Sequence, residues 1–342
     1  MKEDRITILG KLQNNYNTYT QKDINDYIKS GDITEQDLKD IGIPDDILFR
    51  LFNYQVPKLD YGNVPEFVAN GYTEVYFWGD TGSGKTCALA GILGFIDNEG
   101  SFTPEEGDGY LYMTQLKNVF RGKIGVLPGA TNVEVTQYLP FKLSDKKNKQ
   151  HPIALIELSG EIFKCFFETM AGRQLGKTET QTFETLKNYL NGPNKKIHFF
   201  IVDISADPIK LDTNGICLAD YLNAAQLYFT ANDIFKNATE AIYIVATKSD
   251  TLNCPVEERG ELARSFLLEN YKAFINMLKT ACKKYEINDD NDLHVIPFSL
   301  GIVFFNKICE FNPHSSEEIA TILKQKTNAE VSMGFFRRKM NS

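Results

Sequence analysis

A glycine-rich octet in the first third of the chain has the residue types and the spacing needed to hold phosphate groups. It consists of Gly79, Asp80, Thr81, Gly82, Ser83, Gly84, Lys85 and Thr86, and it matches the pattern G-x-x-x-x-G-K-[ST]. Glycines let the backbone curl so that its N–H groups point at phosphates, and a helix that starts here adds the positive end of its dipole. Lys85 is expected to reach the β- and γ-phosphates, and the Thr86 hydroxyl is expected to bind Mg²⁺, which prefers hard oxygen ligands. The octet, with Cys87 directly after it, therefore predicts binding of a nucleoside triphosphate.

A second polar segment indicates which base the nucleotide carries. Thr247, Lys248, Ser249 and Asp250 directly follow the apolar run AIYIVA, which is typical of a buried strand. The Asp250 carboxylate could accept two hydrogen bonds, from the N1–H and the exocyclic amine of guanine, while the Lys248 stem would lie along the purine face. Adenine lacks both donors, so that a buried carboxylate is left unpaired against ATP. The tetrapeptide alone also fits a polar loop that happens to follow a strand, but its place after a strand favours guanine.

Two further strands end in groups that suit the same ligand. Glu157 closes the run PIALIE, where its carboxylate would hold Mg²⁺ through a water, and the N–H of Gly160 would meet the γ-phosphate. Ser299 and Leu300 follow the last predicted strand and would brace the edge of the base through backbone groups. Ligands of open α/β sheets bind at the carboxyl ends of the strands, so these segments are expected to meet there.

The four segments together resemble those of P-loop GTPases of the translation-factor and Ras-like superclass, and the chain looks like a divergent, bacterial-type member. GDTGSGKT corresponds to the Walker A motif, ELSG to D-x-x-G, TKSD to N-K-x-D and FSLG to the S-A-x motif. The resemblance covers residues 72 to 328. The resemblance implies a mostly parallel six-stranded sheet with one antiparallel strand. It also implies that the chain binds GTP or GDP with Mg²⁺, hydrolyses GTP to GDP and phosphate, and acts as a molecular switch for protein partners.

Two departures from that family pattern concern catalysis. Glu157 replaces an aspartate, and Glu161 stands where Ras-like proteins carry the glutamine that orients the attacking water. With Lys85 and Gly160, Glu161 completes the predicted catalytic set. Its negative charge would be repelled by the γ-phosphate oxygens, so we expect slow hydrolysis. Alternatively, Glu161 faces solvent at the start of the next helix, where a negative side chain is favourable.

The segment that leads into a predicted antiparallel hairpin, with strands at 134–143 and at PIALIELSGE, is expected to supply a switch threonine. Thr131 is the first candidate and Thr136 the second. Thr86, Thr131 and Glu157 are then the predicted ligands of the metal. Two rival functions stay open: an ATPase in which Asp203, at the end of HFFIVD, holds the magnesium water, and a nucleotide-binding scaffold that hydrolyses nothing.

The elements that must position these residues divide the chain into three predicted parts. Residues 1–65 show apolar residues at helical spacing and end in a linker rich in proline and glycine, which predicts a small helical module. From residue 66 to 328, strands and helices alternate, which is the pattern of an α/β domain. Residues 329–342 form a basic and aromatic tail. Protein effectors or activators are expected to dock on the helical module.

Composition excludes several classes of function. The chain has 342 residues and a formal net charge of −8, so it has no dominant basic field for nucleic acid. Its six cysteines lack C-x-x-C spacing, which indicates reduced thiols. No apolar run approaches the ~18 residues that cross a bilayer, and the tail has too few aromatic and basic residues for stable anchoring. We therefore expect a cytoplasmic protein without stable membrane insertion.

Overall fold

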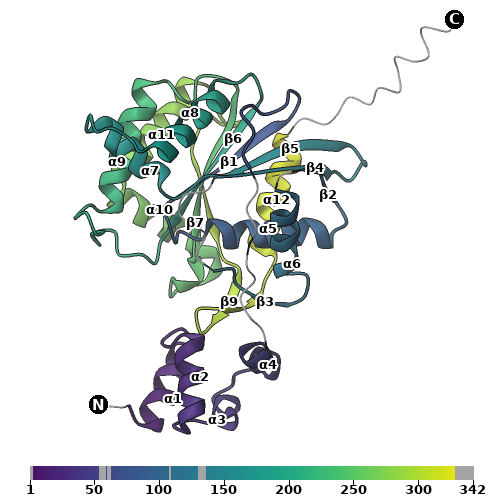
Figure 1. Ribbon diagram of the computed structural model, residues 1–342, viewed down its shortest axis with the longest axis vertical. Helices are drawn as coiled ribbons and strands as arrows, with labels where there is room; N and C mark the ends of the chain where they lie inside the picture. Colours follow the sequence, from purple (N-terminus) through teal and green to yellow (C-terminus); the bar gives the residue numbers. More distant parts are fainter. Residues whose placement is uncertain (1–2, 54–58, 60–62, 108, 130–135, 328–342) are drawn as a thin grey trace, which may run out of the picture.

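The computed structural model describes residues 3–53, 59, 63–107, 109–129 and 136–327, and its centre is a seven-stranded sheet (Figure 1). The strand order is β2-β4-β5-β1-β6-β7-β8. The parallel strands are β1 (Thr73–Trp78), β5 (Gln150–Glu157), β6 (Lys196–Asp203), β7 (Thr239–Thr247) and β8 (His294–Phe298). β4 (Gln137–Ser144) runs antiparallel to β5, and β2 (Phe102–Pro104) pairs with β4 at the edge.

This arrangement confirms the predicted α/β class with a mostly parallel sheet and one antiparallel strand. The predicted number of six strands is wrong, because β2 adds a seventh. β2 has only three residues, so that it carries no periodic pattern by which the sequence could reveal it. The predicted hairpin is present, and its strands pair from Gln137 opposite Glu157 to Ser144 opposite Gln150.

Helices cover both faces of the sheet, and β1 shows why. Its six residues are all buried, with Val75 and Phe77 packed in one core and Tyr76 and Trp78 in the other. Side chains alternate between the faces of a strand, so a strand covered on both sides is apolar throughout. The first core includes residues of α5 (Lys85–Asn98), α6 (Tyr110–Val119) and α12 (His314–Lys326). The second includes residues of α7 (Ile162–Met170), α8 (Lys177–Asn191), α9 (Leu218–Ala231), α10 (Arg259–Asn270) and α11 (Lys272–Lys284).

A second, three-stranded sheet lies beside the carboxyl ends of the large one. Its order is β3 (Ile124–Val126), β10 (Ile308–Phe311) and β9 (Gly301–Phe304), with antiparallel pairing throughout. β8 ends at Phe298, and after Ser299 and Leu300 the chain turns into the β9–β10 hairpin.

The amino-terminal helices form a compact group against this hairpin, at the bottom of Figure 1. They are α1 (Arg5–Asn14), α2 (Gln21–Ser30), α3 (Glu35–Asp40) and α4 (Asp45–Asn53). Capping boxes at Thr20 and Thr34 start α2 and α3, because each side chain accepts a hydrogen bond from an otherwise unpaired backbone N–H. Phe304, Phe305 and Ile308 of the hairpin complete the core of this group. The exact division at residue 65 stays a prediction, and the predicted tail 329–342 lies outside the described residues.

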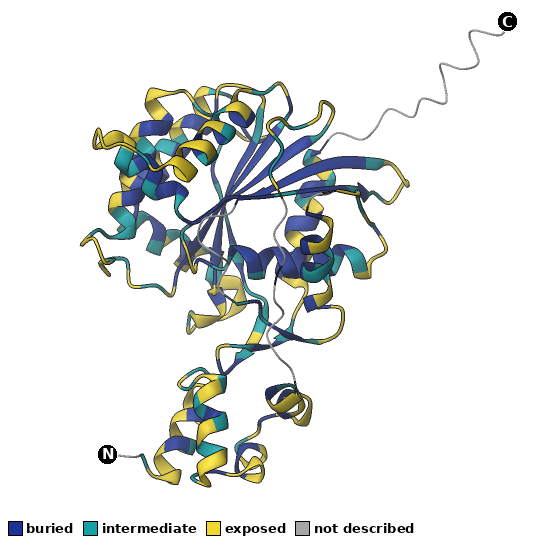
Figure 2. Ribbon diagram, viewed as in Figure 1, coloured by how far each residue is buried: buried dark blue, intermediate teal, exposed yellow. Residues whose placement is uncertain are grey.

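Burial follows the same organisation (Figure 2). The strands of the large sheet are mostly dark blue, which marks buried residues, whereas the amino-terminal helices are buried on one side only. All six cysteines are free. In the described part of the chain, no helix combines the length and the apolar character that crossing a bilayer requires.

Candidate functional site

The glycine-rich octet forms the turn between β1 and α5. Gly84 precedes the helix with φ 89°, a backbone conformation that side chains with a Cβ rarely adopt, and its carbonyl accepts the first helical hydrogen bond from Ala88. The Lys85 ammonium donates to the carbonyl oxygens of Gly79 (2.7 Å) and Asp80 (2.9 Å), so its side chain folds back over the loop. Burial lowers the pKa of Lys85, although Glu157 and Asp80 nearby oppose this shift. A negatively charged phosphate beside this buried ammonium would stabilise the charged form of Lys85.

A buried pair of oxygens lies at the start of α5. The Thr86 hydroxyl donates to Glu157 Oε1 at 2.5 Å, and the Tyr112 hydroxyl of α6 donates to Glu157 Oε2 at 2.6 Å. Burial raises the pKa of the Glu157 carboxyl despite these two hydrogen bonds and the charge of Lys85. Hydroxyl and carboxylate oxygens are the protein ligands that Mg²⁺ takes, and a cation would offset the buried charge. The residues present therefore fit Mg²⁺.

The loop after β5 packs directly on the phosphate loop. A Cβ on Gly160 would lie 2.5 Å from the backbone nitrogen of Thr81 and closer still to its hydroxyl, so only glycine fits. The N–H of Ser159 in turn donates to the hydroxyl of Thr136 at 3.4 Å, which brings the second switch candidate to this loop. Thr131, the first switch candidate, lies outside the described residues.

Glu161 lies at the edge of this region. Its carboxylate pairs with the Lys164 ammonium of α7 at 2.7 Å, with both side chains partly exposed. Glu161 lines a separate cavity of about 450 Å³ with Lys177 and Glu179 of α8. In this conformation its carboxylate pairs with a lysine, and the role predicted for it at the γ-phosphate stays a prediction.

The T-K-S-D segment is joined to the phosphate loop at the end of β7. The Thr247 hydroxyl contacts two carbonyl oxygens, those of Ser83 (2.7 Å) and Val202 (3.1 Å). Lys248 has φ 58° and pairs with the Asp203 carboxylate, which also accepts hydrogen bonds from Ser205. Asp203 is thus engaged on the base side of the site, whereas Glu157 contacts Thr86.

One cavity of about 590 Å³ brings most of the predicted residues together. Its lining includes Thr81, Gly82, Gly84, Lys85, Thr86, Cys87, Glu157, Gly160, Thr247, Lys248, Asp250, Ser299 and Leu300. Gly79, Asp80 and Ser83 form the turn beneath it. Burial raises the pKa of the Cys87 thiol to about 11, so this side chain stays uncharged. Asp250 lines the wall of the cavity but is exposed, not buried as the argument from the sequence assumed, because it lies in the turn after the end of β7.

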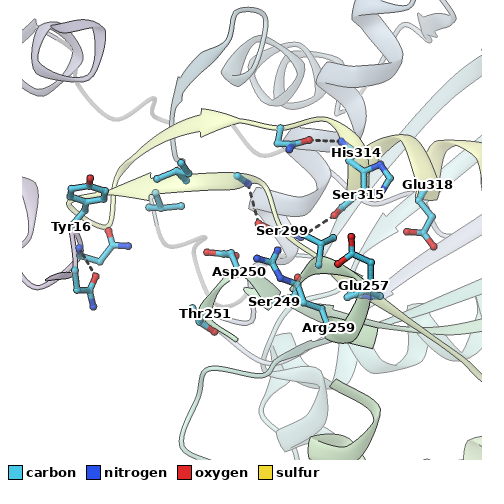
Figure 3. Close-up of a pocket in the computed structure, with 18 of the residues that line it drawn as sticks. Tyr16, Ser249, Asp250, Thr251, Glu257, Arg259, Ser299, His314, Ser315 and Glu318 are labelled. Carbon is cyan, nitrogen blue, oxygen red and sulfur yellow. Dashed lines mark hydrogen bonds between the residues drawn. The ribbon is translucent and has the colours of Figure 1, made fainter. Parts of the chain in front are cut away.

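A second cavity of about 1080 Å³ continues from the base end. Asp250, Ser299 and Val303 border both cavities. Figure 3 shows this space with Tyr16 of the amino-terminal helices on one side and Asp250 and Ser299 on the other. The backbone N–H of Ser299 donates to the Ser315 hydroxyl at 3.2 Å, and the Ser299 hydroxyl accepts from the N–H of Gly301 at 3.1 Å. These two bonds fix the segment that was predicted to brace the base.

Sequence reasoning missed two groups at this site. Tyr112 is one, because a tyrosine in a helical pattern gives no sign of the buried carboxylate that it contacts. Asn15 and Asn17, in the turn between α1 and α2, are the other, and both line the cavity of about 590 Å³. Asparagine is common in turns, so these residues carried no signal of their own.

The fold and the site together define a P-loop protein with the layout of a GTPase. β1 leads through the phosphate loop into a buried helix, the neighbouring β5 ends in ELSG, and β7 ends in TKSD beside the same cavity. The GDTGSGKT and TKSD segments therefore meet at one end of one sheet, where ligands of open α/β sheets bind.

Comparisons with known proteins find similar structures but no similar sequence. No family model matches the chain, and no curated protein does. Similar solved structures include the signal recognition particle receptor SRb–GTP/SRX complex of Chaetomium thermophilum, at 15% identity and a TM-score of 0.38, over 75% of this chain and 99% of that one. Nucleolar GTP-binding protein 1 of Plasmodium falciparum is also similar, at 13% identity and a TM-score of 0.32, over 75% of this chain and 89% of that one. Toc33 of Arabidopsis thaliana is similar at 11% identity and a TM-score of 0.32, over 77% of this chain and 88% of that one. These TM-scores are low, so the class stated above rests on strand order and site geometry.

Proposed function

We propose that the protein binds GTP and GDP with Mg²⁺ and hydrolyses GTP slowly, as a nucleotide-dependent switch in the cytoplasm. The observation that carries this proposal is the shared cavity of about 590 Å³, which is lined at one end by Lys85 and Thr86 and at the other by Lys248 and Asp250. A phosphate-binding loop and a carboxylate that would select guanine over adenine on one cavity suit a guanine nucleotide.

The magnesium part of the proposal is supported by the buried contact between Thr86 and Glu157. When bound, Mg²⁺ would neutralise charge on the β- and γ-phosphates. Thr86 and Glu157 would hold it, with Tyr112 orienting the carboxylate from the other side. These two hydrogen bonds hold the longer side chain of Glu157 at the position where P-loop GTPases have an aspartate.

Slow hydrolysis is supported by the ion pair between Glu161 and Lys164. Water attack on the γ-phosphate needs a group that orients the water, and Glu161 is held away by a lysine in this conformation. A partner that displaces Lys164 would accelerate turnover. If Glu161 serves only the ion pair, the protein is a nucleotide-binding scaffold, and a turnover measurement with GTP separates the two functions.

An ATPase built on Asp203 is less well supported. The Asp203 carboxylate contacts Lys248 and Ser205, while the Thr86 hydroxyl contacts Glu157. A carboxylate that holds the magnesium water must lie near Thr86, and Glu157 is the one that does.

The first experiment is a titration with fluorescent GTP, GDP and ATP analogues in Mg²⁺, on the wild type and on Asp250→Ala. We expect the wild type to prefer guanine, and the variant to lose that preference by about 10- to 100-fold, since hydrogen bonds to a charged group contribute about 1.5–3 kcal/mol. Asp26→Ala, an exposed position on α2, is the control and is expected to change nothing. Equal binding of ATP that the Asp250 variant leaves unchanged would contradict the proposal.

A further inference from the structure

The turn between α1 and α2 lies at the nucleotide cavity, although it belongs to the amino-terminal helices. Asn15 and Asn17 line the cavity together with Lys248, Asp250 and Ser299. They also border the adjoining cavity of about 1080 Å³, again beside Asp250 and Ser299. The turn therefore faces the end of the site predicted to hold the base and ribose.

The β9–β10 hairpin holds this turn in place. The backbone N–H of Asn306 donates to Asn17 Oδ1, and Asn306 Nδ2 donates to the Asn17 carbonyl, both at 2.8 Å. The N–H of Phe305 donates to the Tyr16 carbonyl at 3.1 Å, and the ring of Tyr16 stacks on Phe304 with centroids 4.6 Å apart. The hairpin begins at Gly301, directly after Ser299 and Leu300. The same short segment thus supports both the base end of the cavity and the helices.

The hydrogen bonds of the turn leave amide donors for a ligand. Asn15 Oδ1 accepts from the N–H of Asn17 at 2.9 Å, and Asn17 Oδ1 accepts from Asn306. Within the described part of the chain, no hydrogen bond uses Nδ2 of Asn15 or Asn17. Neutral amide N–H groups suit the carbonyl oxygen of guanine and the ribose hydroxyls, which are acceptors.

We infer that the helical module of α1–α4 is part of the nucleotide site. This inference rests on the proposed GTP-binding function. Asn15 and Asn17 donate hydrogen bonds to the base and ribose of the bound nucleotide, and nucleotide binding stabilises the docking of the module on the β9–β10 hairpin. Coupling between two binding events is reciprocal. If bound nucleotide strengthens the docking of the module by some factor, release of the module weakens the affinity for nucleotide by the same factor. A partner that holds or releases the module would thereby control nucleotide affinity.

The test uses the full chain and the double variant Asn15→Ala/Asn17→Ala. We expect this variant to bind GDP and GTP about five- to thirtyfold more weakly, to the same degree for both, since the lost contacts are with the shared base and ribose. Asn53→Ala, whose side chain donates to the Phe49 carbonyl at the end of α4, is the matched control and is expected to bind as the wild type does. Thermal unfolding of each variant verifies that it is folded.

Hydrogen exchange supplies the second measurement. Saturating GDP is expected to slow amide exchange in α1–α4 of the wild type by at least threefold, and to leave it unchanged in the double variant. Unchanged exchange in the wild type at saturating GDP overturns the inference, as does nucleotide affinity within twofold of the wild type in the double variant. Absence of any guanine-nucleotide binding by the wild type would instead contradict the proposed function itself, so the two failures are distinguishable.

Discussion

The two ends of the nucleotide cavity are built in different ways. The phosphate end consists of eight consecutive residues and a buried carboxylate, and Lys85, Thr86 and Glu157 are all buried there. The base end combines three segments that are far apart in the chain, represented by Asn17, Asp250 and Ser299. The phosphate end is thus formed mostly by one continuous segment, whereas the base end is formed by the ends of two strands of the large sheet and by the turn between α1 and α2. The two ends therefore depend on different contacts, and variants can test them separately.

The largest effect is expected from the phosphate end. Lys85→Ala removes the buried ammonium and should weaken binding of GTP, GDP and ATP alike by about a hundredfold or more, because charge-assisted hydrogen bonds to phosphate are lost. Lys187→Ala, whose lysine pairs with Glu184 on the surface of α8, should leave binding unchanged. Fluorescence titration measures both. A Lys85 variant with weaker affinity for GTP and GDP but unchanged affinity for ATP would contradict the distinction between the two ends.

The close approach of two loops is the next feature to test. Gly160→Ala inserts a Cβ against Thr81 and should destabilise the fold by about 1–3 kcal/mol, as overpacking does in well-packed interiors. Gly122→Ala is the control, since a Cβ there meets no atom within 4 Å. Urea unfolding of the two variants gives the difference. Equal stability would show that the loop after β5 moves freely off the phosphate loop.

A pH series examines β6, the strand that pairs with β1. His198 is buried on β6, accepts a hydrogen bond from Trp78 Nε1 at 3.0 Å, and has its pKa lowered by burial from 6.5 to about 3. The unfolded chain therefore takes up a proton below pH 6.5 that the folded chain does not, so folding stability falls as the pH decreases from 6.5 towards 3. Full uptake of one proton corresponds to about 1.4 kcal/mol per pH unit.

Urea unfolding of the wild type and of His198→Asn between pH 7 and 5 tests this expectation. The variant should lose most of the His198 contribution to the slope, although it is less stable at neutral pH. His314→Asn, which alters an exposed side chain, should keep the wild-type slope. A wild-type slope in the His198 variant would mean that another group causes the acid sensitivity.

The smallest effect is expected from the support of the base end. Ser315→Ala removes the acceptor for the N–H of Ser299 and should weaken GTP and GDP binding by about two- to fivefold. The neighbouring Ser316 is a close control, because its buried hydroxyl has no hydrogen-bond partner among the described residues. Ser316→Ala should therefore be neutral. Titration that shows no effect of Ser315→Ala would mean that Ser299 does not contribute to base binding.

The sequence alone predicted the turn formed by the octet and the parallel strands of the main sheet. The octet determines its own backbone path, because glycines at set positions permit the turn that presents N–H groups to phosphate. The buried parallel strands were predictable for a similar reason, since continuous apolar runs such as HFFIVD mark strands covered on both faces. Asp250 was predicted as a base-binding group because its segment follows such a strand directly, and that role stays a prediction.

Only the tertiary structure decided the rest of the site. β2, β3, β9 and β10 have three or four residues each, too few for a periodic pattern, and pairing partners from distant segments stabilise them. The contact of Tyr112 with Glu157, the ion pair of Glu161 with Lys164 and the position of Asn17 at the cavity depend on how separate elements pack. A residue type and its neighbours in the chain determine local backbone geometry, whereas contacts between distant segments follow from the packing of the whole molecule.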